Sequence, residues 1–320
     1  MTIDIILVLL GLIMVIYGAD ILVDGASAIA RKAGISEFVI GLTIVGFGTS
    51  CPELVVSLTG ALEGNADISI GNVVGSNIFN TMLILGLTAL LMPVGVTAQN
   101  KHRDIPVMLL VTFLFIALGM SKTLLGIGDA DSLSQIEGIV FLVLFISYMI
   151  LCFKTDKGSV DEPAADRKEL GLAAAILLTI GGLALLIFGG DFFVDHSVSL
   201  AHRLGVSDKF IAITLLAGGT SFPELVTCIV AAAKKKGQLA LGNILGSNVF
   251  NILLILGCSA AITPLSLSAM TIVDMGVLAL SAVLVWMSSY TFKKDRIDRY
   301  EGAIFLAAFI LYYVFLFKQL

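Results

Sequence analysis

Long apolar segments recur along the whole chain, with only short polar gaps between them. Each is long enough to cross about 30 Å of hydrocarbon at roughly 1.5 Å per residue of helix. Ten such segments are predicted to be membrane-spanning helices, at residues 4–28, 37–62, 71–92, 104–121, 136–153, 170–196, 208–233, 240–263, 270–290 and 300–317. The first has no Lys or Arg before Arg31 and no small-residue cleavage pattern, so we expect it to remain as a helix and not to be removed as a signal peptide.

The composition supports this pattern. Of the 320 residues, 58% are hydrophobic and only 13% are charged, and the mean hydropathy is +1.03. A soluble globular domain is far more polar than this. The sequence therefore predicts an all-α polytopic membrane protein whose surroundings are a lipid bilayer.

The placement of the basic residues predicts the orientation better than the net charge of −5 does. If both termini are external, every Lys and Arg falls in a cytoplasmic segment except Lys122, Arg203, Lys209 and Lys318. We therefore expect a multi-pass protein of the inner (cytoplasmic) membrane with both termini outside. The triplet at 234–236 fits a short orienting loop, so no nucleic-acid partner is expected.

The chain contains an internal repeat. GTSCPEL at 48–54 matches GTSFPEL at 219–225, and GNVVGSNIFN at 71–80 matches GNILGSNVFN at 242–251, both with an offset of 171 residues. Each half then holds five spans, and an odd number of crossings inverts the second half relative to the first. We predict two inverted five-helix repeats, at 1–153 and 170–320, joined by a charged cytoplasmic linker at 154–169.

The first repeated motif lies deep in two spans and is poorly suited to a continuous helix. Proline removes an amide donor and clashes with the carbonyl four residues earlier, while glycine loosens the same turn. Backbone carbonyls are then expected to be freed beside hydroxyls and a carboxylate, a set that a bound cation would satisfy. The candidate ligands from this motif are Thr49, Ser50, Glu53, Thr220, Ser221 and Glu224.

The second motif adds oxygen ligands, because Ser and Asn four residues apart share a helix face. These are Ser76, Asn80, Ser247 and Asn251. Their alternative role is hydrogen bonding between membrane helices. An all-oxygen set suits the transported ions Ca²⁺ or Na⁺ and not Zn²⁺ or copper, and the Cys and His residues show no metal-ligand spacing.

Several other functions stay open at this point. The two glutamates could exchange protons for Ca²⁺ as a Ca²⁺/H⁺ antiporter, or could be hydrogen-bonded structural side chains. An intramembrane hydrolase lacks a nucleophile motif, and a passive channel fits broken helices in inverted repeats less well than a transporter does. We expect no catalytic residue, no cofactor and no obligatory protein partner.

Two acidic pairs lie near the ends of the spans at 4–28 and 170–196. Asp20 and Asp24 form one i, i+4 pair, and Asp191 and Asp195 form the other at the same offset of 171. They could attract cations at the two mouths of a transport pathway. Hydrated or hydrogen-bonded side chains at helix ends are the alternative.

With GTSxPE and GNxxGSN each present twice, the chain resembles the sodium/calcium exchanger family within the calcium/cation antiporters. The resemblance covers the whole ten-span layout. It implies electrogenic exchange of three Na⁺ per Ca²⁺, with sliding of the first and sixth spans over the rest. It also implies a Ca²⁺ site of Glu53, Glu224 and the carbonyls of Thr49 and Thr220, and overlapping Na⁺ sites that use Gly46, Ser50, Glu53 and Ser247 on one side and Ala217, Ser221, Glu224 and Ser76 on the other, with Asn80 and Asn251 at the centre.

The chain departs from some relatives at two points. Potassium-dependent relatives carry Asp at the position of Asn251, so the Asn indicates exchange that does not need K⁺. The large cytoplasmic regulatory domains of animal relatives are absent, because the linker at 154–169 is too short to hold one.

Overall fold

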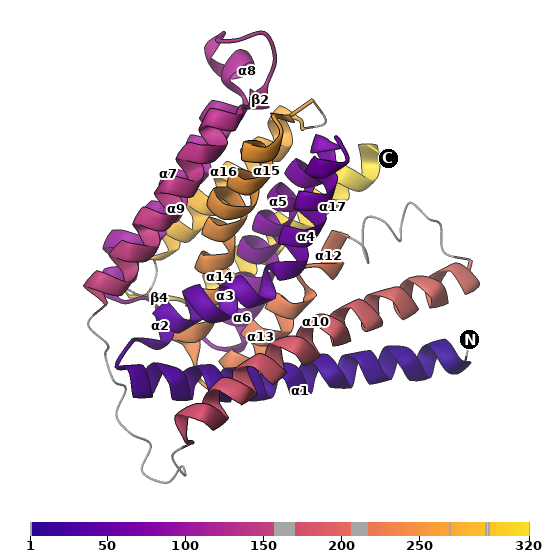
Figure 1. Cartoon of the computed structure of the whole chain (residues 1–320), viewed down its shortest axis with the longest axis vertical. Coiled ribbons are helices and arrows are strands. Elements are labelled where there is room, and N and C mark those ends of the chain that lie inside the picture. The colour runs from indigo at the N-terminus through magenta and orange to yellow at the C-terminus, as the bar shows by residue number, and fades with distance from the viewer. Residues whose placement is uncertain are drawn as a thin grey trace.

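A computed structural model describes residues 2–156, 170–205, 217–268, 270–291, 293 and 295–319. Helices dominate this part of the chain (Figure 1). Segments labelled η are π-helical turns. In chain order the elements are α1 (Thr2–Ala33), α2 (Glu37–Ile40), η1 (Gly41–Val45), α3 (Gly46–Thr49), α4 (Cys51–Leu62), α5 (Ala66–Ile78), η2 (Phe79–Ile84), α6 (Leu85–Leu91), β1 (Val94–Gly95), η3 (Asn100–Asp104), α7 (Ile105–Gly119), α8 (Ser121–Leu125), β2 (Ser132–Leu133), α9 (Gln135–Thr155), α10 (Leu172–Arg203), α12 (Ala217–Gly219), α13 (Phe222–Ala233), α14 (Gly237–Val249), η5 (Phe250–Leu256), α15 (Gly257–Ile262), β3 (Leu265–Ser266), α16 (Ile272–Ser288), β4 (Arg296–Ile297) and α17 (Arg299–Gln319).

Seven of the described helical segments are long and apolar enough to cross a membrane, and the bent pair Glu37–Thr49 and Cys51–Leu62 would make an eighth. Two shorter apolar helices are α13 and α16. The chain is thus a mostly helical, multi-pass membrane protein. The ten-span inverted repeat stays a prediction, and part of its expected seventh span, 208–233, lies outside the described residues.

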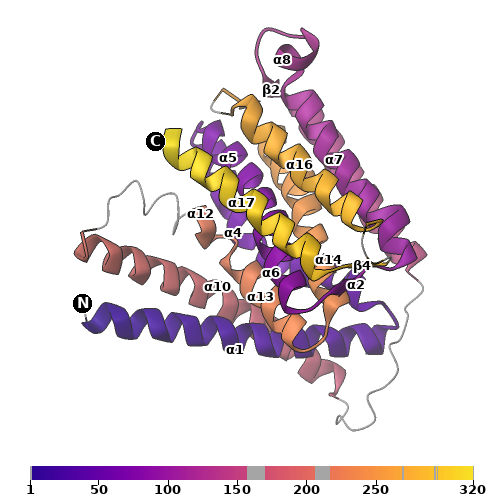
Figure 2. The same ribbon diagram turned by 180° about the vertical axis from the view of Figure 1, so that it is seen from behind.

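The two longest helices, α1 and α10, run antiparallel along each other across one side of the molecule (Figures 1 and 2). Glycine allows their backbones to approach closely. A Cβ on Gly18 would lie 2.9 Å from Leu186 N, and one on Gly189 would lie 3.1 Å from Val15 N. Adding the offset of 171 to Gly18 and Val15 gives Gly189 and Leu186, so the two contacts are equivalent. The two helices therefore contact each other through matching positions.

Two segments form the interior: Ala66–Leu91, which joins α5, η2 and α6, and Gly237–Ile262, which joins α14, η5 and α15. In their most apolar stretches 72% and 94% of the residues are buried, against 22% in α9 and α17. The second segment packs tightly on the broken helix, because a Cβ on Gly242 would lie 2.1 Å from Phe38 O. The matching partner for Gly71 would be near residue 209, outside the described residues.

Two short antiparallel strand pairs connect the halves. β1 pairs with β4, with Val94 opposite Ile297, and β2 pairs with β3, with Leu133 opposite Leu265. Each pair joins a strand from the first half of the chain to one from the second. The halves are therefore held together outside the helices as well as within them.

Candidate ion-binding site

The helix break predicted around the first motif is present in both halves. Ser50 ends α3 with φ −84° and ψ 7°, and Ser221 precedes α13 with φ −86° and ψ 6°. The two helical pieces around Ser50 are bent by 49°. Pro52 stands in the first turn of α4, where its missing N–H costs no hydrogen bond. The Ser50 N–H reaches the carbonyls of Gly46 and Gly48, so it covers part of the backbone that the proline would otherwise leave open.

The break buries a carboxyl group at the start of each following helix. Glu53 lies in the first turn of α4 and is 0% exposed, and Glu224 lies in the first turn of α13 and is 1% exposed. Unpaired amides at a helix N-terminus favour negative charge. Each carboxyl accepts a hydrogen bond from the serine three residues before the other glutamate, which places the two carboxyls in neighbouring parts of the fold. Two acidic groups thus share one buried region.

Serine hydroxyls bind these carboxyls across the two halves. Ser50 Oγ donates to Glu224 Oε1 at 3.0 Å, and Ser221 Oγ donates to Glu53 Oε1 at 2.9 Å. Ser247 Oγ lies 3.0 Å from Ser50 Oγ. Since the one Ser50 proton goes to the carboxyl, Ser247 acts as the donor to Ser50. The structure therefore joins predicted residues of the two halves in two hydrogen-bonded groups, one of Ser50, Ser247 and Glu224 and one of Ser221 and Glu53.

The threonines of the motif contact asparagines that the sequence analysis did not single out. Thr49 Oγ1 lies 3.2 Å from Asn243 Oδ1, and Thr220 Oγ1 lies 3.5 Å from Asn72 Oδ1. Asn72 Nδ2 also donates to Glu53 O at 3.1 Å. Asn72 and Asn243 open the two GNxxGSN motifs, so their recurrence at the same offset was a signal that could have identified them.

Five oxygen atoms of the predicted site residues are buried and have no hydrogen-bond partner among the residues that the structure describes. Burying a polar atom unpaired is costly, and native proteins rarely do so without a reason. These atoms are Glu53 Oε2, Glu224 Oε2, Ser76 Oγ, Asn80 Oδ1 and Asn251 Oδ1. Asn80 and Asn251 both lie in π-helical turns, η2 and η5, a feature frequent at functional sites. Oxygen is also what a hard cation requires.

The remaining predicted ligands occupy less decisive positions. Ser76 is buried in α5, and its Oγ has no hydrogen-bond partner in the described structure. The Gly46 carbonyl accepts the Ser50 N–H at 3.1 Å. Ala217 begins α12, directly after residues that the structure does not describe. Their binding of ions stays a prediction.

No basic residue of the described chain pairs with the two glutamates. Within the described ranges, no Lys, Arg or His forms an ion pair with Glu53 or Glu224. The same part of the chain contains no group of three His, Cys, Asp or Glu suited to a metal ion. A cation held here would therefore rely on the two carboxylates and on neutral oxygens, as Ca²⁺ and Na⁺ do.

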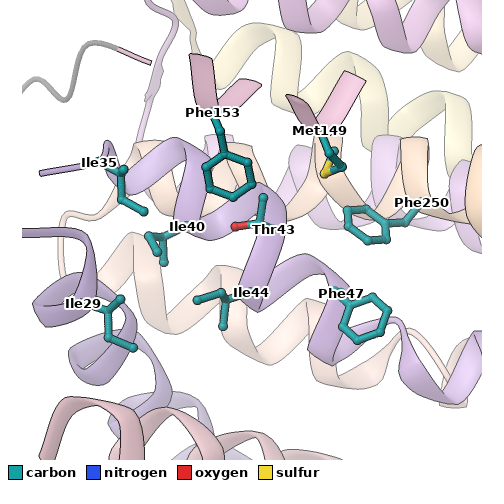
Figure 3. A pocket seen from close by; sticks show the side chains of 9 residues that line it. All are labelled: Ile29, Ile35, Ile40, Thr43, Ile44, Phe47, Met149, Phe153 and Phe250. Atoms are coloured by element: carbon teal, nitrogen blue, oxygen red, sulfur yellow. The ribbon is translucent and has the colours of Figure 1, made fainter. Parts of the chain in front are cut away.

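A pocket of about 360 Å³ beside the broken helix is not part of this site (Figure 3). Only Thr43 contributes a side-chain oxygen to it, and that hydroxyl donates to Val39 O at 2.6 Å. Its lining residues are Ile29, Ile35, Ile40, Thr43, Ile44, Phe47, Met149, Phe153 and Phe250. Such a surface offers hydrocarbon contacts and no ligand for an ion.

Comparison with known proteins finds relatives that cover nearly the whole chain. The putative antiporter CaxA of Alkalimonas amylolytica is 39% identical over 326 residues, covering 98% of each chain. The sodium/calcium exchanger MaX1 of Methanosarcina acetivorans is 34% identical over 350 residues, covering 99% of each. A solved structure of the sodium-calcium exchanger NCX_Mj is 35% identical, with a TM-score of 0.84 over 97% of this chain and 98% of that one.

The sequence pattern, the crossed carboxyl network and these similarities agree. The family model described as sodium/calcium exchanger protein matches residues 3–154 and 174–318, which is nearly all of the chain. The resemblance noted from the two repeated motifs is thereby confirmed. The protein is a cation exchanger that belongs to the sodium/calcium exchanger family.

Proposed function

We propose that this chain exchanges Na⁺ for Ca²⁺ across the cytoplasmic membrane as a secondary antiporter. The observation that carries the proposal is a pair of buried carboxyl groups to which no basic residue of the described structure is paired, each with one oxygen that has no hydrogen-bond partner there. An unpaired carboxylate is expensive at membrane depth. A hard cation removes that cost for both glutamates at once.

The proposed ligands follow the two halves of the network. Ca²⁺ would lie between Glu53 and Glu224 and take the carbonyls of Thr49 and Thr220. One Na⁺ would use Gly46, Ser50 and Ser247 with Glu53, and another would use Ala217, Ser221 and Ser76 with Glu224. Asn80 and Asn251 complete the centre. The crossed serines support this assignment, because each half contributes a hydroxyl to the carboxyl of the other.

Shared carboxylates explain the coupling. One Ca²⁺ neutralises two negative charges, and Na⁺ ions compete for the same oxygens, so simultaneous occupancy is disfavoured electrostatically. Antiport follows if the empty carrier crosses the barrier more slowly than either loaded form. Asn251 is neutral where potassium-dependent relatives carry Asp. The proposed site therefore has no third carboxylate, and the exchange does not need K⁺.

The reciprocal contacts of α1 and α10 support alternating access in two inverted repeats. In this proposal the pair slides across the broken helices and opens the site to one side at a time. Both chain ends would lie outside the cell, with the basic triplet at 234–236 in the cytoplasm.

A second candidate uses H⁺ as the counter-ion at the same glutamates. Glu53 Oε2 and Glu224 Oε2 have no hydrogen-bond partner in the described residues, so each oxygen could bind a proton as well as a metal ion. In the first candidate the Ser50 and Ser221 hydroxyls take part in Na⁺ binding. In the second they only orient the carboxyls.

The test is uptake of ⁴⁵Ca²⁺ into Na⁺-loaded proteoliposomes diluted into Na⁺-free buffer, with a pH gradient in place of Na⁺ as the parallel condition. We expect uptake that needs internal Na⁺ and that is lost in Glu53→Gln. Glu63→Gln, the same change at the exposed end of α4, is the matched control and should transport normally. Uptake driven only by the pH gradient would establish the proton antiporter instead.

A further inference from the structure

Asn77 lies beside the centre of the site and is not one of the proposed ion ligands. It is 2% exposed in α5. Its side chain connects two residues of the other half of the chain: Asn77 Nδ2 donates to Asn248 O at 3.2 Å, and Asn251 Nδ2 donates to Asn77 Oδ1 at 2.9 Å. These two bonds link the Asn248 carbonyl, the Asn77 side chain and the Asn251 side chain in that order.

The donor and acceptor of each hydrogen bond follow from the Asn248 carbonyl. A backbone carbonyl such as Asn248 O can only accept a hydrogen bond, so Asn77 must present its NH₂ group there. Its oxygen then faces Asn251, which must donate. The amide of Asn251 is thereby turned so that its own oxygen points away from Asn77, and this oxygen is one of the five without a partner.

The other half of the site lacks this arrangement. By the offset of 171 the mate of Asn77 is Asn248, but Asn248 Nδ2 donates to Thr81 Oγ1 at 2.8 Å, and Asn248 Oδ1, which would accept from Asn80, has no partner in the described structure. Both polar atoms of the Asn80 amide are without a partner in the described part of the chain. Asn80 can therefore present either oxygen or NH₂ to the site, whereas Asn251 can present only oxygen.

We propose that Asn77 is a positioning residue that makes Asn251 a permanently oriented oxygen ligand for Ca²⁺. This inference rests on the proposed function and adds a division of labour between the two central asparagines. Orientation in advance removes an entropy cost from ion binding. It also keeps an NH₂ group, which repels cations, out of the centre of the site.

Equilibrium binding of ⁴⁵Ca²⁺ to the purified protein in detergent, in Na⁺-free buffer, tests this directly. The variants are Asn77→Ala, Asn251→Ala and the double variant. Loss of an orienting partner typically weakens metal binding about 10- to 100-fold, and we expect Asn77→Ala to weaken it about tenfold. Because Asn77 acts through Asn251, the double variant should bind no more than about twofold more weakly than Asn251→Ala.

A matched control separates orientation from stability. Asn100, the first residue of η3, is also buried and hydrogen-bonded, to Thr97 and Asp104. Asn100→Ala should lower the melting temperature as Asn77→Ala does, yet leave Ca²⁺ affinity unchanged.

Two results would overturn the inference: wild-type affinity in Asn77→Ala, or a double variant whose loss is the product of the two single losses. Either would leave the proposed function standing. If the wild-type protein bound no Ca²⁺ at all, the proposed function itself would fail.

Discussion

The two halves of the proposed ion site carry the same motifs, but only some of the contacts that these motifs make are alike. The crossed bonds of Ser50 to Glu224 and Ser221 to Glu53 are equal within 0.1 Å, at 3.0 and 2.9 Å. The central amides are unequal, because Asn251 is held by Asn77 and Asn80 is held by nothing in the described structure. Duplicated sequence therefore ensures a shared carboxyl network without ensuring that both halves bind an ion in the same way.

A second difference lies where each broken helix ends. Lys234 Nζ, at the end of α13, lies 2.8 Å from Asp20 Oδ1 and 2.9 Å from Asp24 Oδ1 on α1. The residue that matches Lys234 at the end of α4 is Glu63. Asp20 and Asp24 are thus partly neutralised, so of the two acidic pairs considered as cation attractors, this one is engaged in structure. Glu63 is negatively charged, as are Asp191 and Asp195, the equivalent pair in α10. It could not form an ion pair with them.

Loss of either carboxylate should have the largest effect. We expect Glu53→Gln and Glu224→Gln to weaken Ca²⁺ binding at least about 100-fold each, because one carboxylate near a divalent ion contributes several kcal/mol at the effective dielectric of a protein. Binding of ⁴⁵Ca²⁺ measures both. A loss confined to one of them would contradict the symmetric carboxyl network.

Removal of the Ser50 or Ser221 hydroxyl should have the next largest effect on Ca²⁺ binding. Ser50→Ala and Ser221→Ala should each weaken Ca²⁺ binding about tenfold, because a hydrogen bond to a charged group contributes about 1.5 kcal/mol or more. Ser50→Ala should be the more damaging, since Ser247 also loses its acceptor. Isothermal titration of the two variants side by side would show this order, and the reverse order would argue against the Ser247 contact.

Truncation of the Asn80 side chain should weaken Ca²⁺ binding less than the changes above. Asn80→Ala is expected to weaken Ca²⁺ binding only about threefold, against about tenfold for Asn251→Ala, because Asn80 must lose side-chain freedom when it binds. Equal losses in the two variants would show that the Asn77 contact gives Asn251 no advantage.

The smallest effect concerns the ends of the broken helices. Lys234→Gln should lower the apparent melting temperature by about 2–4 °C at low salt, the shift that corresponds to roughly 1 kcal/mol from a half-exposed ion pair. The difference should shrink at high salt as the charges are screened. Glu63→Gln serves as the control and should not lower it. A shift that is the same at all salt concentrations would mean that packing, not charge, holds Lys234.

Much of the site could be predicted because its residues repeat. Glu53, Glu224, Ser50, Ser221 and Ser247 were expected from motif and spacing, and the structure joins them. Asn72 and Asn77 were missed, because an asparagine between membrane helices usually serves only as a hydrogen-bonding contact. Which asparagine holds a ligand depends on the partner it meets, and sequence does not contain that information.

The sequence by itself determined that the chain is a multi-pass helical protein, that its helices break at the two proline motifs, and that two carboxylates lie there. The reason is local: apolar length, proline and glycine act within a few residues of themselves. Only the tertiary structure decided that each serine binds the carboxyl of the opposite half, that Lys234 pairs with α1, and that Asn251 donates to Asn77 while Asn80 has no partner in the described structure. Those contacts join residues more than 160 positions apart along the chain, and only packing decides which of them meet.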